Sequence, residues 1–431
     1  MSNLQQQKQQ ANSLRKQGLL KEALPIYHEL WKTTTKDKFD AAGYLHCLRK
    51  LNMNEEALSL VKECEKDYSD FNWCRNEIIW TYIGSLKMMN ETASIGSVLP
   101  IANKIMKLNP DELPKNTTVL FVLKKAKQFK KWDIATLWVD RINPDTLDKE
   151  PITLSKGTTG WSNFLIWHHH KVRCLIHQKK YQEAIEMVNS IINKANQEKK
   201  FFQCLAAQAY EQMGKSDKAI QVLTDLSKHK KVDWWIVHQL ANVLKNKGEK
   251  EKALKKMYQA ATLSYRLESI VTLLHDIALI CKELNRLEES YYHLLLLKLI
   301  REKKEWVVKG DVEQLIKETG NYLNLTNMMN YKDVLHQCRT YWNTIAASDN
   351  KKTIEGNSKR ESKNALNGTL IQVKDEKPFC FIKTPDESFF CYKSDIKGEA
   401  KEGLKVKFDA IPSFDKKKQQ ESWKAINIVL M

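Results

Sequence analysis

GKSDKAIQVLTDL (Gly214–Leu226) and GEKEKALKKMYQA (Gly248–Ala260) begin 34 residues apart and share one pattern of side chains. Each starts with glycine, has alanine five residues later, and has small or apolar residues four and seven positions after that alanine. A period of this length is typical of folds built from a repeated unit. The same frame recurs, more loosely at some copies, from Gly18, Asn52, Lys130, Lys179 and Asn285.

Each copy of this frame predicts two antiparallel helices joined by a tight turn. Glycine or asparagine ends the first helix in a left-handed conformation. A small residue such as Ala219 lets the second helix approach the first closely, and the apolar residues after it lie on the same helical face. Only 14 of 431 residues are glycine and 9 are proline, which agrees with a mainly helical chain.

The frame and its period resemble the tetratricopeptide repeat. The resemblance runs from residue 4 to about residue 307 and implies a right-handed α-solenoid over residues 1–345, with a candidate break in a longer loop at 150–164. In this family the concave inner groove usually holds a peptide or a protein partner, and the repeats carry no catalytic groups. The expected hairpins are 4–37, 38–71, 72–110, 116–149, 165–199, 200–233, 234–270 and 271–307, followed by a capping helix pair at 311–345.

Composition and motifs limit the classes of protein to which this chain can belong. A net charge of +18 favours a polyanionic partner. Nine cysteines, an odd number with no CxxC pair, favour a reduced, cytoplasmic protein. The opening MSNLQQQKQQ has no apolar run of a secretory signal, and no stretch approaches the roughly 20 apolar residues of a membrane span. No GxxxxGKS/T, GxGxxG, HExxH or GxSxG motif occurs, so we expect neither an enzyme nor a bound cofactor.

The pattern changes after residue 345. Residues 346–367 are polar and rich in Ser, Asn and Lys, which predicts a flexible linker. From 368 to 431, segments of period two alternate with polar turns, and five short strands in this length predict a small closed β-barrel. The segments are GTLIQV, FCFIKT, SFFCYK, LKVKFDAI and AINIVLM.

Three parts of this region resemble the cold-shock domain, an OB-fold barrel. They are KPFCFI (Lys377–Ile382), where the family has Lys-Gly-Phe-Gly-Phe-Ile, FFCY (Phe389–Tyr392), where it has Val-Phe-Val-His, and Glu402–Phe408 followed by Ala425–Ile428. The sequence departs from the family at Gln372, where the family has Trp, at Pro378, where it has Gly, and at Tyr392, where it has His. The resemblance implies binding of single-stranded RNA or DNA.

Strand alternation supports the same function, because side chains two residues apart lie on one face of a sheet. Four aromatic rings then share an exposed face flanked by lysines, and such a face stacks unpaired bases while the lysines meet phosphates. The alternative is a degenerate barrel whose aromatic rings pack against the solenoid or against a partner. The predicted nucleic-acid-binding residues are Lys377, Phe379, Phe381, Lys383, Phe390, Tyr392 and Lys393.

The repeat frame also indicates which residues line the groove. Three histidines occupy one repeat position, which faces the groove in this family, and could bind an acidic or polar peptide. The predicted groove residues are His169, Arg173, Trp235, His238, Asn242 and His275.

Two other patterns are incomplete. Lys8 and Asn12 begin the clamp that chaperone-binding tetratricopeptide domains use, but its later positions fall at Gly43, Trp73 and Glu77, so no chaperone binding is predicted. His170, Cys174 and His177 could share a helical face, but no fourth ligand accompanies them, so no metal site is predicted.

These features together predict a non-enzymatic adaptor that binds a protein partner through the solenoid and single-stranded RNA or DNA through the barrel. The domain pairing is similar to that of proteins found beside helicases and nucleases in bacterial defence systems. One alternative is a pure protein–protein scaffold whose barrel binds no nucleic acid. Another is a translational regulator whose solenoid itself contacts RNA.

Overall fold

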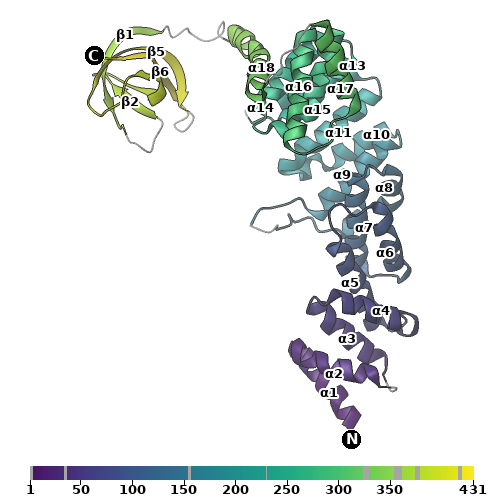
Figure 1. Cartoon of the computed structure of the whole chain (residues 1–431). Helices are drawn as coiled ribbons and strands as arrows, with labels where there is room; N and C mark the ends of the chain where they lie inside the picture. The colour runs from purple at the N-terminus through teal and green to yellow at the C-terminus, as the bar shows by residue number, and fades with distance from the viewer. Residues whose placement is uncertain are drawn as a thin grey trace. The chain divides into compact units, whose positions relative to one another are not determined.

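The computed structural model describes residues 3–33, 36–153, 157–229, 231–323, 330–353, 362–373, 379–415 and 420–431. The chain divides into two compact units, Met1–Arg339 and Thr340–Met431. Helices build the first unit, and strands dominate the second (Figure 1). The predicted fold class, a mainly helical repeat array followed by a small β-barrel, is confirmed.

The described helices alternate as first and second members of hairpins, which follow one another in chain order (Figure 1). The first members are α1 (Asn3–Lys16), α3 (Lys38–Lys50), α5 (Asn72–Met88), α7 (Glu112–Gln128), α9 (Asn163–His177), α11 (Lys199–Gln212), α13 (Trp234–Asn246), α15 (Val271–Glu283) and α17 (Gly310–Tyr322). The second members are α2 (Leu20–Lys32), α4 (Asn54–Tyr68), α6 (Ile95–Lys107), α8 (Trp132–Val139), α10 (Tyr181–Ile191), α12 (Ser216–Ser227), α14 (Lys250–Leu263), α16 (Leu287–Lys303) and α18 (Tyr331–Thr353).

The turn inside seven of the described hairpins has the backbone conformation that the sequence frame predicts. All seven positions have a positive φ, between 54° and 91°. The small residue five positions later is buried at every copy, and at the one serine copy Ser290 donates its hydroxyl to the carbonyl of Ala278 at 2.8 Å. The seven turn residues are Gly18, Asn52, Lys130, Lys179, Gly214, Gly248 and Asn285.

Packing in the first unit follows the repeat. The first helices from α1 to α15 each pack against their own second helix, and those from α1 to α13 also pack against a first helix of a neighbouring hairpin, as α3 does with α5 and α7 with α9. One hydrophobic core extends from Trp31 to Ala209. The hairpin expected at 116–149 begins earlier, at Glu112, because the first turn of α7 tolerates Pro114. The loop expected at 150–164 is present, and within it Thr153 and Thr159 form an isolated antiparallel bridge.

Five strands close the barrel of the second unit. These five are β1 (Lys363–Ile371), β2 (Phe379–Lys383), β3 (Ser388–Tyr392), β5 (Lys405–Asp415) and β6 (Gln420–Leu430), and a sixth, short strand is β4 (Ile396–Lys397). Around the ring the order is β1-β2-β3-β6-β5, and a parallel contact between Phe390 and Lys424 joins β3 to β6. The two-residue strand β4 pairs with β6. The core inside the ring includes Leu370, Ile382, Phe389, Phe408 and Trp423.

Regular structure occupies both ends of the range that the sequence predicts as a linker, 346–367. Helix α18 continues to Thr353, and strand β1 begins at Lys363. The early part of β1 exists because Leu366 pairs with Phe408 of β5 and packs on the barrel core, a contact that local composition does not encode. Strand β1 also ends at Ile371, so Gln372 follows the strand, with a φ of 56°.

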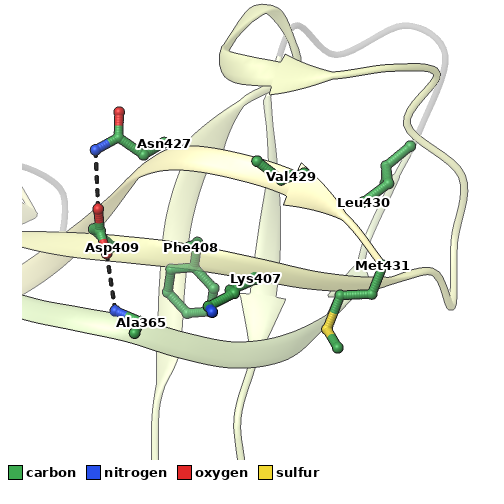
Figure 2. Close-up of a pocket in the computed structure, with 8 residues that line it drawn as sticks. All are labelled: Ala365, Lys407, Phe408, Asp409, Asn427, Val429, Leu430 and Met431. Atoms are coloured by element: carbon green, nitrogen blue, oxygen red, sulfur yellow. Dashed lines mark hydrogen bonds between the residues drawn. The ribbon is translucent and has the colours of Figure 1, made fainter.

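One carboxylate joins two irregular points of the barrel wall (Figure 2). Ala365 in β1 and Asn427 in β6 both have a positive φ, and the strand register shifts beside each of them. Asp409 of β5 accepts hydrogen bonds from the backbone N–H of Ala365 and from the side-chain amide of Asn427, both at 2.9 Å. The side chain therefore satisfies a backbone donor that the bulge removes from the strand ladder.

Candidate nucleic-acid interface and partner groove

The four predicted aromatic residues lie together on the outer face of β2 and β3. Phe379 and Phe381 on β2 and Phe390 on β3 are half-buried, and Tyr392 is 43% exposed. The Phe390 ring lies in the middle of the group, with its centroid 5.5 Å from Phe379, 5.9 Å from Phe381 and 5.0 Å from Tyr392. These separations are those of contacting aromatic rings, so the four rings form one continuous surface.

Strand register explains this arrangement. Phe379 pairs with Tyr392 and Phe381 with Phe390, so the outward residues meet across the two strands. The alternate residues, among them Cys380 and Cys391, point inward and are fully buried. The two thiol sulfurs are 3.3 Å apart inside the barrel. The inward and outward assignment made from alternation is thus confirmed for both strands.

The two predicted lysines that the structure describes occupy different environments. Lys383 ends β2, is exposed, and pairs with Ser388 across the hairpin. Lys393 follows Tyr392 directly in a short 3-10 helix, Lys393–Asp395, and is half-buried. Lys377 lies outside the described residues.

Sequence reasoning missed a cation that contacts the ring surface. The Lys424 ammonium of β6 lies over the Tyr392 ring, 5.0 Å from its centroid, and also 3.3 Å from a carboxylate oxygen of Asp395. Lys424 is 32 positions after Tyr392 in the chain and reaches it only because β3 and β6 close the ring. No local pattern in the sequence could have indicated this contact.

A shallow basic cavity of about 640 Å³ adjoins the ring surface. Its lining includes Ile371, which pairs with Phe381, and Lys383 at the end of the same strand. Thr369 pairs with both Lys383 and Lys405, so the two lysines flank one threonine. An apolar ring surface that continues into two ammonium groups and a hydroxyl can stack a base and hold the adjoining phosphate.

In the first unit, the structure brings His169 and Arg173 together. They are one turn apart on α9, and the Arg173 Nε donates to the His169 Nε2 at 3.5 Å. His169 is only 6% exposed, and burial together with the charges of Arg173 and Lys127 lowers its pKa to about 2. The imidazole is therefore neutral and acts as a support for Arg173 more than as a surface group.

Trp235 belongs to a row of aromatic rings that crosses three hairpins. Its ring stacks on Phe201 of α11 at 5.2 Å with an interplanar angle of 16°. Phe201 in turn contacts Trp161 at 5.1 Å, and Trp161 contacts His169 at 5.2 Å. All of these except His169 are half-buried, so the row is partly accessible.

The remaining predicted groove residues form a separate polar group on α13 and α15. The Nε2 atom of His238 is 2.8 Å from a carboxylate oxygen of Asp276. The side-chain amide of Asn242 approaches the same nitrogen at 3.4 Å. His275 is half-buried beside Asp276 in the chain. The six predicted residues thus fall into two neighbourhoods along the unit: the aromatic row connects His169 and Arg173 to Trp235, and the other three lie on α13 and α15.

Lys8, the first residue of the incomplete clamp, pairs with acidic residues of the chain itself. The Lys8 ammonium lies 2.7 Å from Asp37 and 2.6 Å from Asp40. Glu77, only 6% exposed, is held by Arg49 at 2.7 Å and His46 at 2.8 Å. Burial favours a higher pKa for Glu77, but the hydrogen bond from His46 and the charge of Arg49 outweigh it and lower the pKa.

No cluster of three or more His, Cys, Asp or Glu side chains in the described part of the chain is arranged to hold a metal ion. No described helix is both long and apolar enough to cross a membrane.

Comparison with known proteins gives one partial family match. A model described as "Domain of unknown function (DUF7017)" matches residues 200–340, which is about a third of the chain. No curated protein matches the chain.

Several solved structures are similar at low sequence identity. A tetratricopeptide repeat protein from Parabacteroides merdae shares 13% identity over 63% of this chain and 96% of its own, with a TM-score of 0.31. The apo form of RapI shares 14% over 82% of this chain and 99% of its own, with a TM-score of 0.38. A STAND protein with a tetratricopeptide repeat sensor from Pyrococcus horikoshii shares 12% over 78% of this chain and 55% of its own, with a TM-score of 0.39.

Proposed function

We propose that this protein is a non-enzymatic adaptor, in which the helical unit binds a protein partner and the barrel binds single-stranded RNA or DNA. The observation that carries the nucleic-acid part is the surface of four contacting rings on β2 and β3 with Lys424 and Lys383 beside it. Stacking of a base on such a ring contributes about 1–3 kcal/mol and tolerates any base.

The order of strands supports a cold-shock-like barrel. In OB-folds, a five-stranded barrel presents strands 2 and 3 to its oligonucleotide. The rings of this chain lie on the second and third strands, and the strand order around the ring is β1-β2-β3-β6-β5. The position of the rings on these strands and the chemistry of the rings therefore support the same face as the nucleic-acid-binding surface.

The repeat architecture supports the protein-binding part. Stacked helical hairpins present an extended surface, and proteins of this architecture use it for binding. The half-buried row Trp161, Phe201 and Trp235 offers large rigid rings of the kind that anchor protein interfaces.

Fluorescence anisotropy of the full chain with labelled single-stranded RNA and DNA tests the nucleic-acid part. We compare the wild type with the double variant Phe379→Ala/Phe390→Ala, and with Val429→Ala as a control on a barrel wall away from the rings. The proposal predicts binding that the double variant loses and the control keeps.

Circular dichroism must show that both variants remain folded. Absence of binding by the wild type would leave a pure protein scaffold. Binding that survives the double variant would assign the nucleic acid to the helical unit.

A further inference from the structure

Two cysteines oppose each other inside the barrel wall. Cys380 of β2 and Cys391 of β3 are cross-strand partners in the antiparallel register. Their sulfur atoms are 3.3 Å apart, and the Cys391 thiol donates to the backbone carbonyl oxygen of Cys380 at 3.5 Å. Both side chains are fully buried in the barrel core. The pair therefore lies on the inner side of the two strands that carry the aromatic rings.

The strand register meets the distance requirement of a disulfide bond. Directly opposed residues of an antiparallel pair have Cα atoms about 4.5–5.5 Å apart. Cysteines joined by a disulfide have Cα atoms about 4.4–6.8 Å apart. The two sulfurs need to approach by about 1.3 Å, from 3.3 Å to the roughly 2.0 Å of an S–S bond, and rotation of the side chains can supply this.

A second pair of thiols is in contact in the helical unit and serves as a comparison. Cys64 of α4 and Cys74 of α5 hydrogen-bond each other, and this bond together with burial raises the pKa of the Cys64 thiol. These two cysteines lie on consecutive helices, so no ladder of strand pairs fixes the spacing of their backbones. The barrel pair has this additional constraint.

The described barrel wall is held least extensively beside Cys391. Strand β3 pairs with β2 at five positions, but among the described residues it pairs with β6 only through Phe390 and Lys424. A seam with so few backbone contacts opens locally at a lower free-energy cost than the β2–β3 ladder does. Opening of the seam gives a small solute access to Cys391, the residue after Phe390.

The closed barrel protects the pair from reaction. Burial raises the pKa of the Cys391 thiol, and the neighbouring Cys380 thiol raises it further. The thiolate is the reactive form of cysteine, so the thiols react slowly while the seam is closed. Oxidation therefore follows local opening of the barrel.

We propose that Cys380 and Cys391 form a redox modification site, at which a peroxide converts the two thiols to a cross-strand disulfide. This inference is independent of nucleic-acid binding. One thiol first takes an oxygen atom from hydrogen peroxide and becomes a sulfenic acid, with release of water. The other thiol then attacks the sulfenic sulfur, and the S–S bond forms as a second water leaves. The pair thus transfers two electrons and two protons to the peroxide, and a dithiol restores both thiols by exchange.

The disulfide ties together the two strands that carry the rings. It closes a loop that contains the hairpin turn, where the N–H of Thr384 donates to the carbonyl oxygen of Glu387 at 2.9 Å. A covalent link between opposed residues prevents β2 and β3 from separating. The cross-strand register of Phe381 and Phe390 is then retained even when the seam to β6 opens.

Peptide mapping of the full chain tests for the bond. The protein is treated with hydrogen peroxide and unfolded, remaining thiols are blocked with N-ethylmaleimide, and a non-reducing trypsin digest is analysed by mass spectrometry. Trypsin cuts after Lys374, Lys383 and Lys393 but not between Lys377 and Pro378, so the bond would join peptides 375–383 and 384–393. We expect this linked pair, lighter by two hydrogen atoms than the free peptides together, and its loss on treatment with dithiothreitol.

Hydrogen exchange of the full chain measures the structural consequence. Amides in 379–392 should exchange at least tenfold more slowly in the oxidised protein than in the reduced protein. Cys380→Ala should abolish both the linked peptides and this difference. Cys391→Val, which keeps a buried apolar side chain in the strand, makes the same test if Cys380→Ala does not fold. Cys64→Ala is the matched control, because it removes the other thiol contact and should leave the barrel result unchanged.

Two mapping results would overturn the inference: alkylation of both barrel thiols after peroxide treatment, or disulfides confined to Cys64 and Cys74 or to links between molecules. A barrel disulfide that leaves hydrogen exchange of both strands unchanged would overturn the role assigned to the bond. None of these results bears on the Phe379→Ala/Phe390→Ala experiment, which uses the reduced protein.

Discussion

Replacement of Phe390 by alanine is the sharpest single perturbation of the proposed nucleic-acid interface. Phe390 is the central ring, in contact with Phe379, Phe381 and Tyr392, and it pairs with Lys424 across the closure of the barrel. The substitution removes one stacking surface and leaves every lysine in place. It should therefore change affinity without changing the number of phosphates contacted.

The expected size follows from stacking. One base stacked on one ring contributes about 1–3 kcal/mol. At about 1.4 kcal/mol per factor of ten, Phe390→Ala should weaken binding of a single strand by about fivefold to about 150-fold. The dependence of log affinity on log salt should keep its slope, because that slope counts neutralised phosphates.

The assay is anisotropy of a labelled single strand at four or more salt concentrations, with Val429→Ala as the folded control. Lys383→Gln gives the opposite signature, since loss of one phosphate contact should reduce the slope by about 0.7. A loss smaller than twofold for Phe390→Ala, or a slope that falls with it, would refute the stacking role.

Three predictions concern the stability of the two units. Gly368→Ala should destabilise the barrel by about 1–3 kcal/mol in urea unfolding, since the new Cβ would lie 2.4 Å from the Cγ2 atom of Ile382; an unchanged midpoint would contradict the packing. Glu77→Gln should cost the helical unit about 3 kcal/mol, because it leaves Arg49 without its counter-ion, and equal unfolding free energies would show the network to be unimportant. The folded pKa of His170 is about 4 against about 6.5 when unfolded, so its contribution to stability is present above pH 6.5 and is lost as the pH falls towards 4; His170→Leu should make the urea midpoint less sensitive to acid over that window, and an identical pH profile would count against it.

Most of the helical fold could be predicted from the sequence, because each copy of the repeat carries the same local pattern of residues. The residue that ends each first helix and the small residue five positions later are both local requirements, and the structure places Asn52 and Ala57, for example, as the frame predicts. The outward rings of β2 and β3 followed from strand alternation for the same reason. Period and alternation are properties of neighbouring residues.

What the sequence did not reveal depends on contacts between distant residues. The first half of β1 forms because β5 covers it, so polar composition alone predicted a linker there. Lys424 reaches Tyr392 only through closure of the ring.

Cross-linking of a 4-thiouridine-containing single strand to the full chain, with mass spectrometry of the linked peptides, tests the central claim most directly. The account predicts cross-links in the segment of β2 and β3, Phe379–Tyr392, and their disappearance in Phe379→Ala/Phe390→Ala. Cross-links confined to the helical unit would contradict it, and so would a strand that binds the full chain equally well without these rings.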